Sequence, residues 1–154
     1  MMGRRRALMA QINSGMPLST FIDGTYSGTG YNYSIANNIV SVYTAGAIEN
    51  NMVSMPFLPV VPVVSGDIVS VSFSLEPDST AWKARTCNIF IGDRSRINLC
   101  DKSITSLDGL TLTATSTTAI NLNKLCIRIR NQGVSYSPPL KFTAEIKVNG
   151  VRVL

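Results

Sequence analysis

Histidine is absent from the 154 residues of this chain, and its absence argues against several classes of enzyme. Serine and cysteine nucleophiles usually depend on a histidine base, and histidine is also the commonest metal ligand. A glycosidase stays open, because it needs only two carboxyl groups that flank the scissile bond. The acidic residues number only nine, and nearly all lie beside Gly, Pro, Asn or Ser in predicted turns. We therefore expect no enzymatic activity and no catalytic residues.

Cysteine is scarce and unpatterned. Cys87, Cys100 and Cys126 are odd in number, and none of them has CxxC or Cys/His spacing. This argues against both a disulfide framework and a zinc site, so three packed thiols and no metal ligands are expected.

Three aspartates in predicted turns are candidate ligands for the one cofactor considered, a calcium ion. Asp23, Asp67 and Asp108 each lie beside a glycine or another turn residue. Because calcium takes hard oxygen ligands from loops, these residues are candidates for a structural calcium ion. No other cofactor is expected.

Charge is low, with 15% charged residues against 45% hydrophobic ones. This is little charge with which to solvate a free monomer, so part of the surface is predicted to meet a partner. Arg4, Arg5 and Arg6 supply three of the 14 basic residues, and the remaining 11 nearly balance the 9 acidic ones. A basic tail on a near-neutral body, without interleaved basic and aromatic positions, argues against nucleic-acid binding.

No apolar run is long enough to cross a bilayer. The longest, residues 52–64, is interrupted by Pro56, Pro59 and Pro62. Because proline donates no backbone hydrogen bond, the run from Pro56 onward is predicted to be an edge strand or an extended, polyproline-like segment. Polar residues directly follow the short apolar segment 7–10, which argues against a signal peptide. We expect no membrane contact and a protein made in the cytosol.

Residues 67–75 alternate between apolar and small polar side chains, with the sequence Asp-Ile-Val-Ser-Val-Ser-Phe-Ser-Leu. In an extended chain, the valines, Phe73 and Leu75 point to one side and the serines to the other. The pattern predicts a β-strand that buries one face in a core.

Further strand patterns follow at close spacing, separated by turn residues. No long stretch has the period of a helix, so the chain is predicted to form an all-β, antiparallel β-sandwich of the jelly-roll type. Asn149-Gly150 predicts a tight hairpin turn between strands at 141–148 and 151–154. The other predicted strands are 31–35, 38–44, 52–55, 84–91, 95–99, 103–107, 110–115 and 125–130.

The first 24 residues are predicted to form a basic arm and linker that precede one domain, residues 25–154. The arm begins with good helix formers and ends at Asn13-Ser14-Gly15, which is typical of a short helix or a flexible arm. A helix this short needs a docking surface to be stable. The residues predicted to anchor it to a partner are Arg4, Arg5, Arg6, Leu8, Met9 and Ile12.

Aromatic and arginine side chains supply the candidate ligand site. Trp82, the only tryptophan, either forms a platform under a sugar ring or plugs one end of the sandwich. Arg94 and Arg96 share one side of a predicted strand, as do Arg128 and Arg130. If those strands are neighbours, four guanidinium groups line one outer face, which either binds an anionic glycan or an acidic neighbour or is a solvated strip. The candidate ligand-binding residues are Trp82, Tyr31, Tyr33, Tyr136, Arg128 and Arg130.

Several segments together resemble a known family. The opening, Met-Gly-Arg-Arg-Arg-Ala-Leu-Met-Ala at residues 2–10, looks like the start of short structural proteins in phages and prophages of gut Firmicutes. The body, from about Tyr26 onwards, resembles the jelly-roll, carbohydrate-binding-module-like domains of phage tail and baseplate proteins. The segments that carry this resemblance are 65–73, 88–93, 110–115, 125–130 and 145–152.

The resemblance implies a virion component that is assembled in the host bacterial cytoplasm, usually as a symmetric oligomer, and it permits binding of cell-surface polysaccharide. The leading hypothesis is therefore a non-enzymatic virion structural protein, a decoration, fibre or tail module, whose partners are other virion subunits and further copies of itself. The alternative is a carbohydrate-binding module for host-surface glycans. A glycosidase is the third hypothesis.

Overall fold

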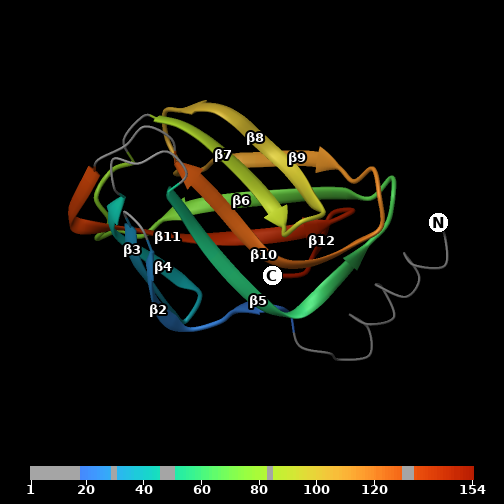
Figure 1. Ribbon diagram of the computed structural model, residues 1–154, viewed down its shortest axis with the longest axis horizontal. Coiled ribbons are helices and arrows are strands. Elements are labelled where there is room, and N and C mark those ends of the chain that lie inside the picture. The colour runs from blue at the N-terminus through green and yellow to red at the C-terminus, as the bar shows by residue number, and fades with distance from the viewer. Residues whose placement is uncertain (1–17, 29–30, 46–50, 83–84, 130–133) are drawn as a thin grey trace.

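The structure, a computed structural model, describes residues 18–28, 31–45, 51–82, 85–129 and 134–154. These residues form an all-β antiparallel sandwich of two sheets, as predicted (Figure 1). Within these ranges no helix has the length and hydropathy needed to span a bilayer. The strands are β1 (Thr20–Phe21), β2 (Gly24–Gly28), β3 (Tyr31–Ala36), β4 (Ile39–Ala45), β5 (Asn51–Val63), β6 (Ile68–Leu75), β7 (Arg85–Gly92), β8 (Arg96–Ile104), β9 (Thr111–Thr115), β10 (Ile120–Ile129), β11 (Val134–Val148) and β12 (Val151–Arg152).

The two sheets have five and seven strands. The five-stranded sheet has the order β1-β5-β10-β7-β8, and the seven-stranded sheet has the order β2-β3-β4-β11-β6-β9, with β12 paired to β11. In Figure 1, β5, β10 and β7 run diagonally across β6 and β11 of the other sheet. The hydrophobic core therefore lies between these two groups of strands.

Strand β6 confirms the alternation seen in the sequence. Val69, Val71 and Phe73 are fully buried, and the ring of Phe73 meets that of Phe142 edge to face, with centroids 5.9 Å apart. The serines face outward, where Ser72 and Thr111 share a hydrogen bond of 3.0 Å between their hydroxyl oxygens. One face of the seven-stranded sheet is thus core and the other is a polar surface.

Two turns at one end of β6 are joined by side chains. The buried carboxylate of Asp67 accepts hydrogen bonds from the Val64 amide N–H and from Nδ2 of Asn149, both at 2.9 Å. Asn149 and Gly150 have φ values of 50° and 80° and form the predicted hairpin turn between β11 and β12. Oδ1 of Asn149 accepts the Ile68 amide N–H at 2.9 Å, so the side chain fixes both turns.

Strand β5 corrects the prediction for the proline-rich run. It is the second strand of its sheet and pairs with β1 on one side and with β10 on the other, so it is not an edge strand. The register with β10 shifts between Leu122 and Lys124, opposite residues 57–60, and β1 pairs with only two residues of β5. An irregular ladder accommodates prolines, because their missing N–H groups are not all required there.

Several strand boundaries also differ from those predicted. Strand pairing begins at Thr20, within the segment that was predicted to be a linker, and β2 pairs along its whole length with β3. Residues 103–104 continue β8, and β11 begins at Val134, in a stretch for which no strand was predicted. Pairing partners, which the local sequence does not reveal, extend these strands beyond their apolar segments.

We expect Asp67→Ala to lower the free energy of unfolding by about 1–3 kcal/mol, because it leaves buried donors unpaired. The matched control is Asp108→Ala, which removes one exposed carboxylate that accepts the Leu75 amide N–H at 2.9 Å. This control should lower the free energy of unfolding by at most about 1 kcal/mol. Urea unfolding followed by the fluorescence of Trp82 measures both, and equal losses would contradict the role given to Asp67.

Candidate functional site

The outer face of the five-stranded sheet has its centre on β7, which lies between β10 and β8. From Cys87 to Ile91, the odd-numbered residues point into the core and are fully buried. Since side chains alternate along a strand, Asn88 and Phe90 point outward. The register places Arg128 of β10 directly opposite Asn88.

Two arginines converge on Phe90. The Cζ atom of Arg96 lies 4.2 Å from the centroid of the Phe90 ring, and that of Arg128 lies 5.6 Å from it. Both distances are in the range of cation–π contacts, which attract a guanidinium group to the face of an aromatic ring. The ring is buried beneath them, so it orients the two arginines and is not itself an exposed platform.

Asn88 and Arg128 each keep one buried polar atom unpaired. Nδ2 of Asn88 donates to the Cys100 carbonyl oxygen at 3.1 Å, but the Asn88 Oδ1 has no partner among the described residues. Nε of Arg128 is also buried and has no hydrogen-bond partner within the same part of the chain. A buried polar atom without a partner costs free energy, so two of them on facing residues mark a place that a polar ligand or a water would complete.

We call this group, Asn88, Phe90, Arg96 and Arg128, the arginine face. Within the described ranges neither of its guanidinium groups forms an ion pair. Next to it, Lys124 pairs with Asp93 at 3.3 Å. As far as the described residues go, the arginine face therefore combines two cations that lack a carboxylate partner with one amide oxygen that lacks a donor.

The turn between β7 and β8 positions Arg96. Gly92 has a φ of 107°, and a Cβ atom there would lie 2.7 Å from the Ser95 carbonyl oxygen. Only glycine fits this conformation without strain, so the turn brings Arg96 back opposite Gly92 at the start of β8.

The structure brings together two of the four arginines that were predicted to form a cluster. Strands β8 and β10 are not neighbours, because β7 lies between them, yet Arg96 and Arg128 still meet over Phe90. Arg94 is exposed in the turn between β7 and β8 and makes no contact with that ring in the structure as described. Arg130 lies outside the described residues, as do all the predicted arm residues, Arg4, Arg5, Arg6, Leu8, Met9 and Ile12.

The aromatic candidates are mostly part of the core. Trp82 is buried and its Nε1 donates to the Ile104 carbonyl oxygen at 3.2 Å, which favours the plug over the sugar platform. Tyr136 is buried as well. The predicted exposed rings are therefore absent at these two positions, because both side chains complete the packing of the sandwich.

Tyr33 belongs to a stack of three tyrosines. Its ring lies 4.9 Å from that of Tyr26 and 5.4 Å from that of Tyr31. Its hydroxyl donates to the Ser54 carbonyl oxygen at 2.5 Å and accepts the Ser54 amide N–H at 3.2 Å, which ties β3 to β5 of the other sheet. Burial raises the pKa of Tyr33 above its usual value, so it stays neutral. This hydroxyl closes the sandwich and does not face a ligand.

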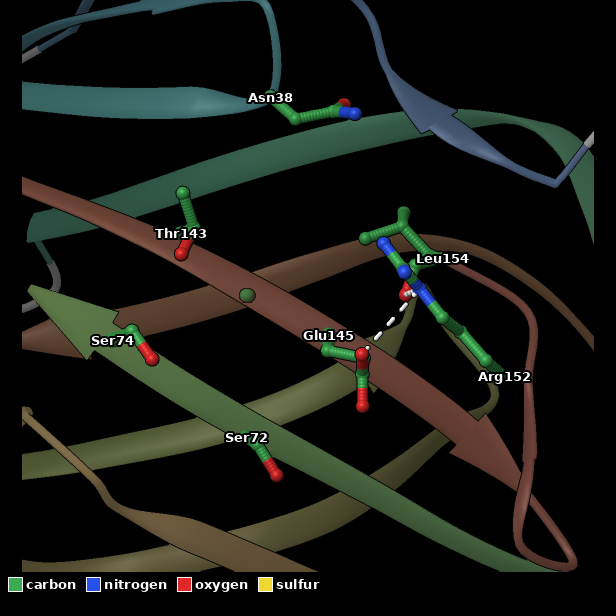
Figure 2. Close-up of a pocket in the computed structure, with 8 residues that line it drawn as sticks. Asn38, Ser72, Ser74, Thr143, Glu145, Arg152 and Leu154 are labelled. Atoms are coloured by element: carbon green, nitrogen blue, oxygen red, sulfur yellow. Dashed lines mark hydrogen bonds and ion pairs between the residues drawn. The ribbon is translucent and has the colours of Figure 1, made fainter.

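A polar hollow of about 380 Å³ opens on the seven-stranded sheet (Figure 2). Among the described residues that line it, Glu145 is the only one with a carboxyl side chain, and it pairs with Arg152, with 3.4 Å between Oε2 and Nε. A glycosidase would need a second carboxyl side chain facing Glu145, and none of these lining residues supplies one. The lining residues are Asn38, Ser72, Ser74, Thr143, Ala144, Glu145, Arg152 and Leu154.

The turn aspartates lie apart from one another and hold the backbone. Asp23 accepts the Asn37 amide N–H at 3.1 Å, and Asp108 accepts that of Leu75 at 2.9 Å. Asp67 serves the two turns described above. Across the ranges that the structure describes, no group of three His, Cys, Asp or Glu residues could hold a metal ion. The three candidate calcium ligands are therefore not brought together.

The sequence did not identify Asn88 and Phe90 as site residues, because residues 88–91 look like part of any half-buried strand. The alternation indicated only that Asn88 and Phe90 lie on the same side of their strand. Their pairing with Arg128 depends on sheet order, which joins β7 to a strand more than 30 residues away, beyond β8 and β9. Arg128 itself was predicted as a ligand-binding residue.

No family model matches the chain, and no curated protein matches it. Among solved structures, the low-affinity xylan-binding module CBM86 of Roseburia intestinalis is 13% identical, with a TM-score of 0.45 over 85% of this chain and 97% of that one. A carbohydrate-binding module of family 29 is 11% identical, with a TM-score of 0.45 over 86% and 89%. A CBM4 structure is 16% identical, with a TM-score of 0.45 over 82% and 79%. At this level of identity the function has to be inferred from the side chains of the arginine face.

The three cysteines are free and buried, which confirms the prediction of packed thiols. Burial, with a smaller effect of Cys100 and Asp101, raises the pKa of Cys87 to about 12, and burial also raises that of Cys126. Since the thiolate is the reactive form, we expect no reaction of the folded protein with Ellman's reagent at pH 8 and three reactive thiols in guanidinium chloride. Rapid labelling of the folded chain would contradict this.

Proposed function

We propose that this chain is a non-catalytic binding module for a glycan that carries carboxylate groups, and that the arginine face is its binding site. The observation that carries the proposal is the pair of unpaired atoms, Nε of Arg128 and Oδ1 of Asn88, on facing residues of β10 and β7. One atom is a donor with positive charge and the other is an acceptor. An acidic sugar offers the complement of both, a carboxylate and a hydroxyl.

The guanidinium groups suit a carboxylate better than a neutral sugar. Arginine presents planar, parallel N–H donors that bind a carboxylate through two hydrogen bonds, and it is less strongly hydrated than lysine. Contact with Phe90 orients both Arg96 and Arg128 before a ligand arrives. Such preorganisation reduces the entropy lost on binding.

The chemistry of the face favours binding over turnover. Hydrolysis of a glycosidic bond requires a general acid and a second carboxyl group. The chain has no histidine, and Asp93 beside the arginine face is paired with Lys124. A second carboxylate, that of Asp101, lies opposite Asn88 on β8 and has an interaction of its own. The two guanidinium groups and the Asn88 amide oxygen can hold a ligand without transferring a proton.

The virion structural role, which was the leading hypothesis from the sequence, remains a prediction, as does location in a virion. The names of the three structures above are those of sugar-binding modules and mention no phage. Binding of host-surface polysaccharide, the alternative hypothesis, agrees better with the arginine face. The two roles are compatible, since a module can bind a glycan and also be attached to other subunits.

We expect the wild-type chain to bind oligogalacturonate in isothermal titration calorimetry, more weakly as salt rises, and to bind neutral xylo-oligosaccharides less tightly. Arg128→Ala should weaken binding at least tenfold, about 1.4 kcal/mol, while Arg94→Ala, which removes the same charge from the neighbouring turn, should change it less than twofold. Circular dichroism and thermal melting show whether Arg128→Ala is folded, and Arg128→Lys serves as a conservative second variant. Equal affinities of the two alanine variants, or no binding to the acidic glycan, would contradict the proposal.

A further inference from the structure

The other half of the same outer face is apolar. Thr20 pairs with Leu58, so in this antiparallel register Leu18 faces Val60, and Ile22 faces Pro56. The Ile22 amide N–H donates to the Pro56 carbonyl oxygen at 2.8 Å, which extends the pairing to this end. Alternate residues Ser19, Phe21 and Phe57 point inward and are buried, so the large side chains between them point outward. We call Leu18, Ile22, Leu58 and Val60 the apolar strip.

The strip is exposed in the part of the chain that the structure describes. The exposed fraction of its side chains is 56% for Leu58, 41% for Ile22 and Val60, and 40% for Leu18. Only two other large apolar residues, Tyr43 and Ile68, are comparably exposed among the described residues, and they belong to the other sheet. Single exposed apolar residues are ordinary, but four on adjoining strands form a patch that usually has an occupant.

The backbone of the strip is held firmly in place. Beneath it, the rings of Phe21 and Phe57 meet edge to face with centroids 6.3 Å apart. Ser19 donates from its amide to the Val153 carbonyl oxygen at 2.9 Å and from its hydroxyl to the Pro59 carbonyl oxygen at 2.6 Å. A fixed flat surface of this kind loses little entropy when another segment packs on it.

The sequence supplies a matching segment next to the strip. Leu8, Met9 and Ile12 are the large apolar members of residues 7–12, and their spacing would place them on one side of a helical turn. Ile12 precedes Leu18 by six residues, which span at most about 20 Å, whereas the extended segment from Leu18 to Ile22, which contains β1, covers about 13 Å. Every part of the strip is therefore within reach of residues 7–12 of the same chain.

We propose that the side chains of Leu8, Met9 and Ile12 cover the apolar strip of their own chain. A tether of a few residues gives the segment a high effective concentration at the strip, which favours it over a second copy. The docking surface that a short N-terminal helix requires is then the β1–β5 edge of the sandwich. This proposal does not depend on the ligand of the arginine face.

The test is disulfide trapping in the full chain. Met9→Cys combined with Leu58→Cys should form an intramolecular disulfide under mild oxidation, seen as a faster-migrating monomer on a non-reducing gel and a loss of two hydrogens in intact mass. Met9→Cys combined with Ile68→Cys is the matched control, because Ile68 is 48% exposed on the other sheet and should stay reduced. The native cysteines are buried and do not compete.

Three outcomes would overturn the proposal: no disulfide in the Leu58 pair, equal disulfide formation in both pairs, or a covalent dimer in place of the internal link. A dimer would mean that a second copy covers the strip. As an independent measurement, Leu8→Ser, Met9→Ser and Ile12→Ser together should raise the fluorescence of the apolar dye ANS at least twofold. Unchanged dye fluorescence would also count against the proposal.

Discussion

The pairing of β6 with β11 is the contact on which the rest of the sandwich depends. Their register runs without a break from Phe142 opposite Leu75 to Val148 opposite Val69, and the buried side chains of both strands enter one core. A slip of one residue would turn every apolar side chain toward solvent, so the alternation of the sequence fixes the register. The side chains of Asp67 and Asn149 then hold the two turns at the end of this strand pair, through hydrogen bonds to each other and to backbone amides.

Because the inner faces of the two sheets form the core, their outer faces are available for binding. The outer face of the five-stranded sheet divides into an apolar strip on β1 and β5 and a charged region on β10, β7 and β8. The charged region holds two guanidinium groups against a buried aromatic ring, with unpaired polar atoms on Asn88 and Arg128. Free energy is lost by leaving those atoms unpaired, and a ligand that pairs with them recovers it. This face is the basis of the proposed binding of an acidic glycan.

The sequence allowed the sandwich to be predicted because alternation is a local signal, readable in residues 67–75 without knowledge of any partner. Sheet order is not local, and this explains why the run from Pro56 onward was predicted to be an edge strand or an extended, polyproline-like segment, although β1 and β10 flank β5. Likewise, the sequence could not decide whether Trp82 plugs the sandwich or forms a sugar platform, since the carbonyl that its buried Nε1 contacts lies on β8. Arg128 was identified as a ligand candidate from its type and parity alone. Its partners Asn88 and Phe90 depend on a long-range register, which one sequence does not contain.

The most direct measurement is a ¹H–¹⁵N NMR titration of the full chain with tri-galacturonate, with backbone assignments. The account predicts that the largest shift changes fall on the amides of β7 around Asn88 and Phe90 and of β10 around Arg128, together with the side-chain Nε–H of Arg128. Saturation of these changes at one site would be consistent with a single binding face. The largest changes at Ser72, Thr143 and Glu145 of the hollow on the other sheet, or none anywhere, would contradict it.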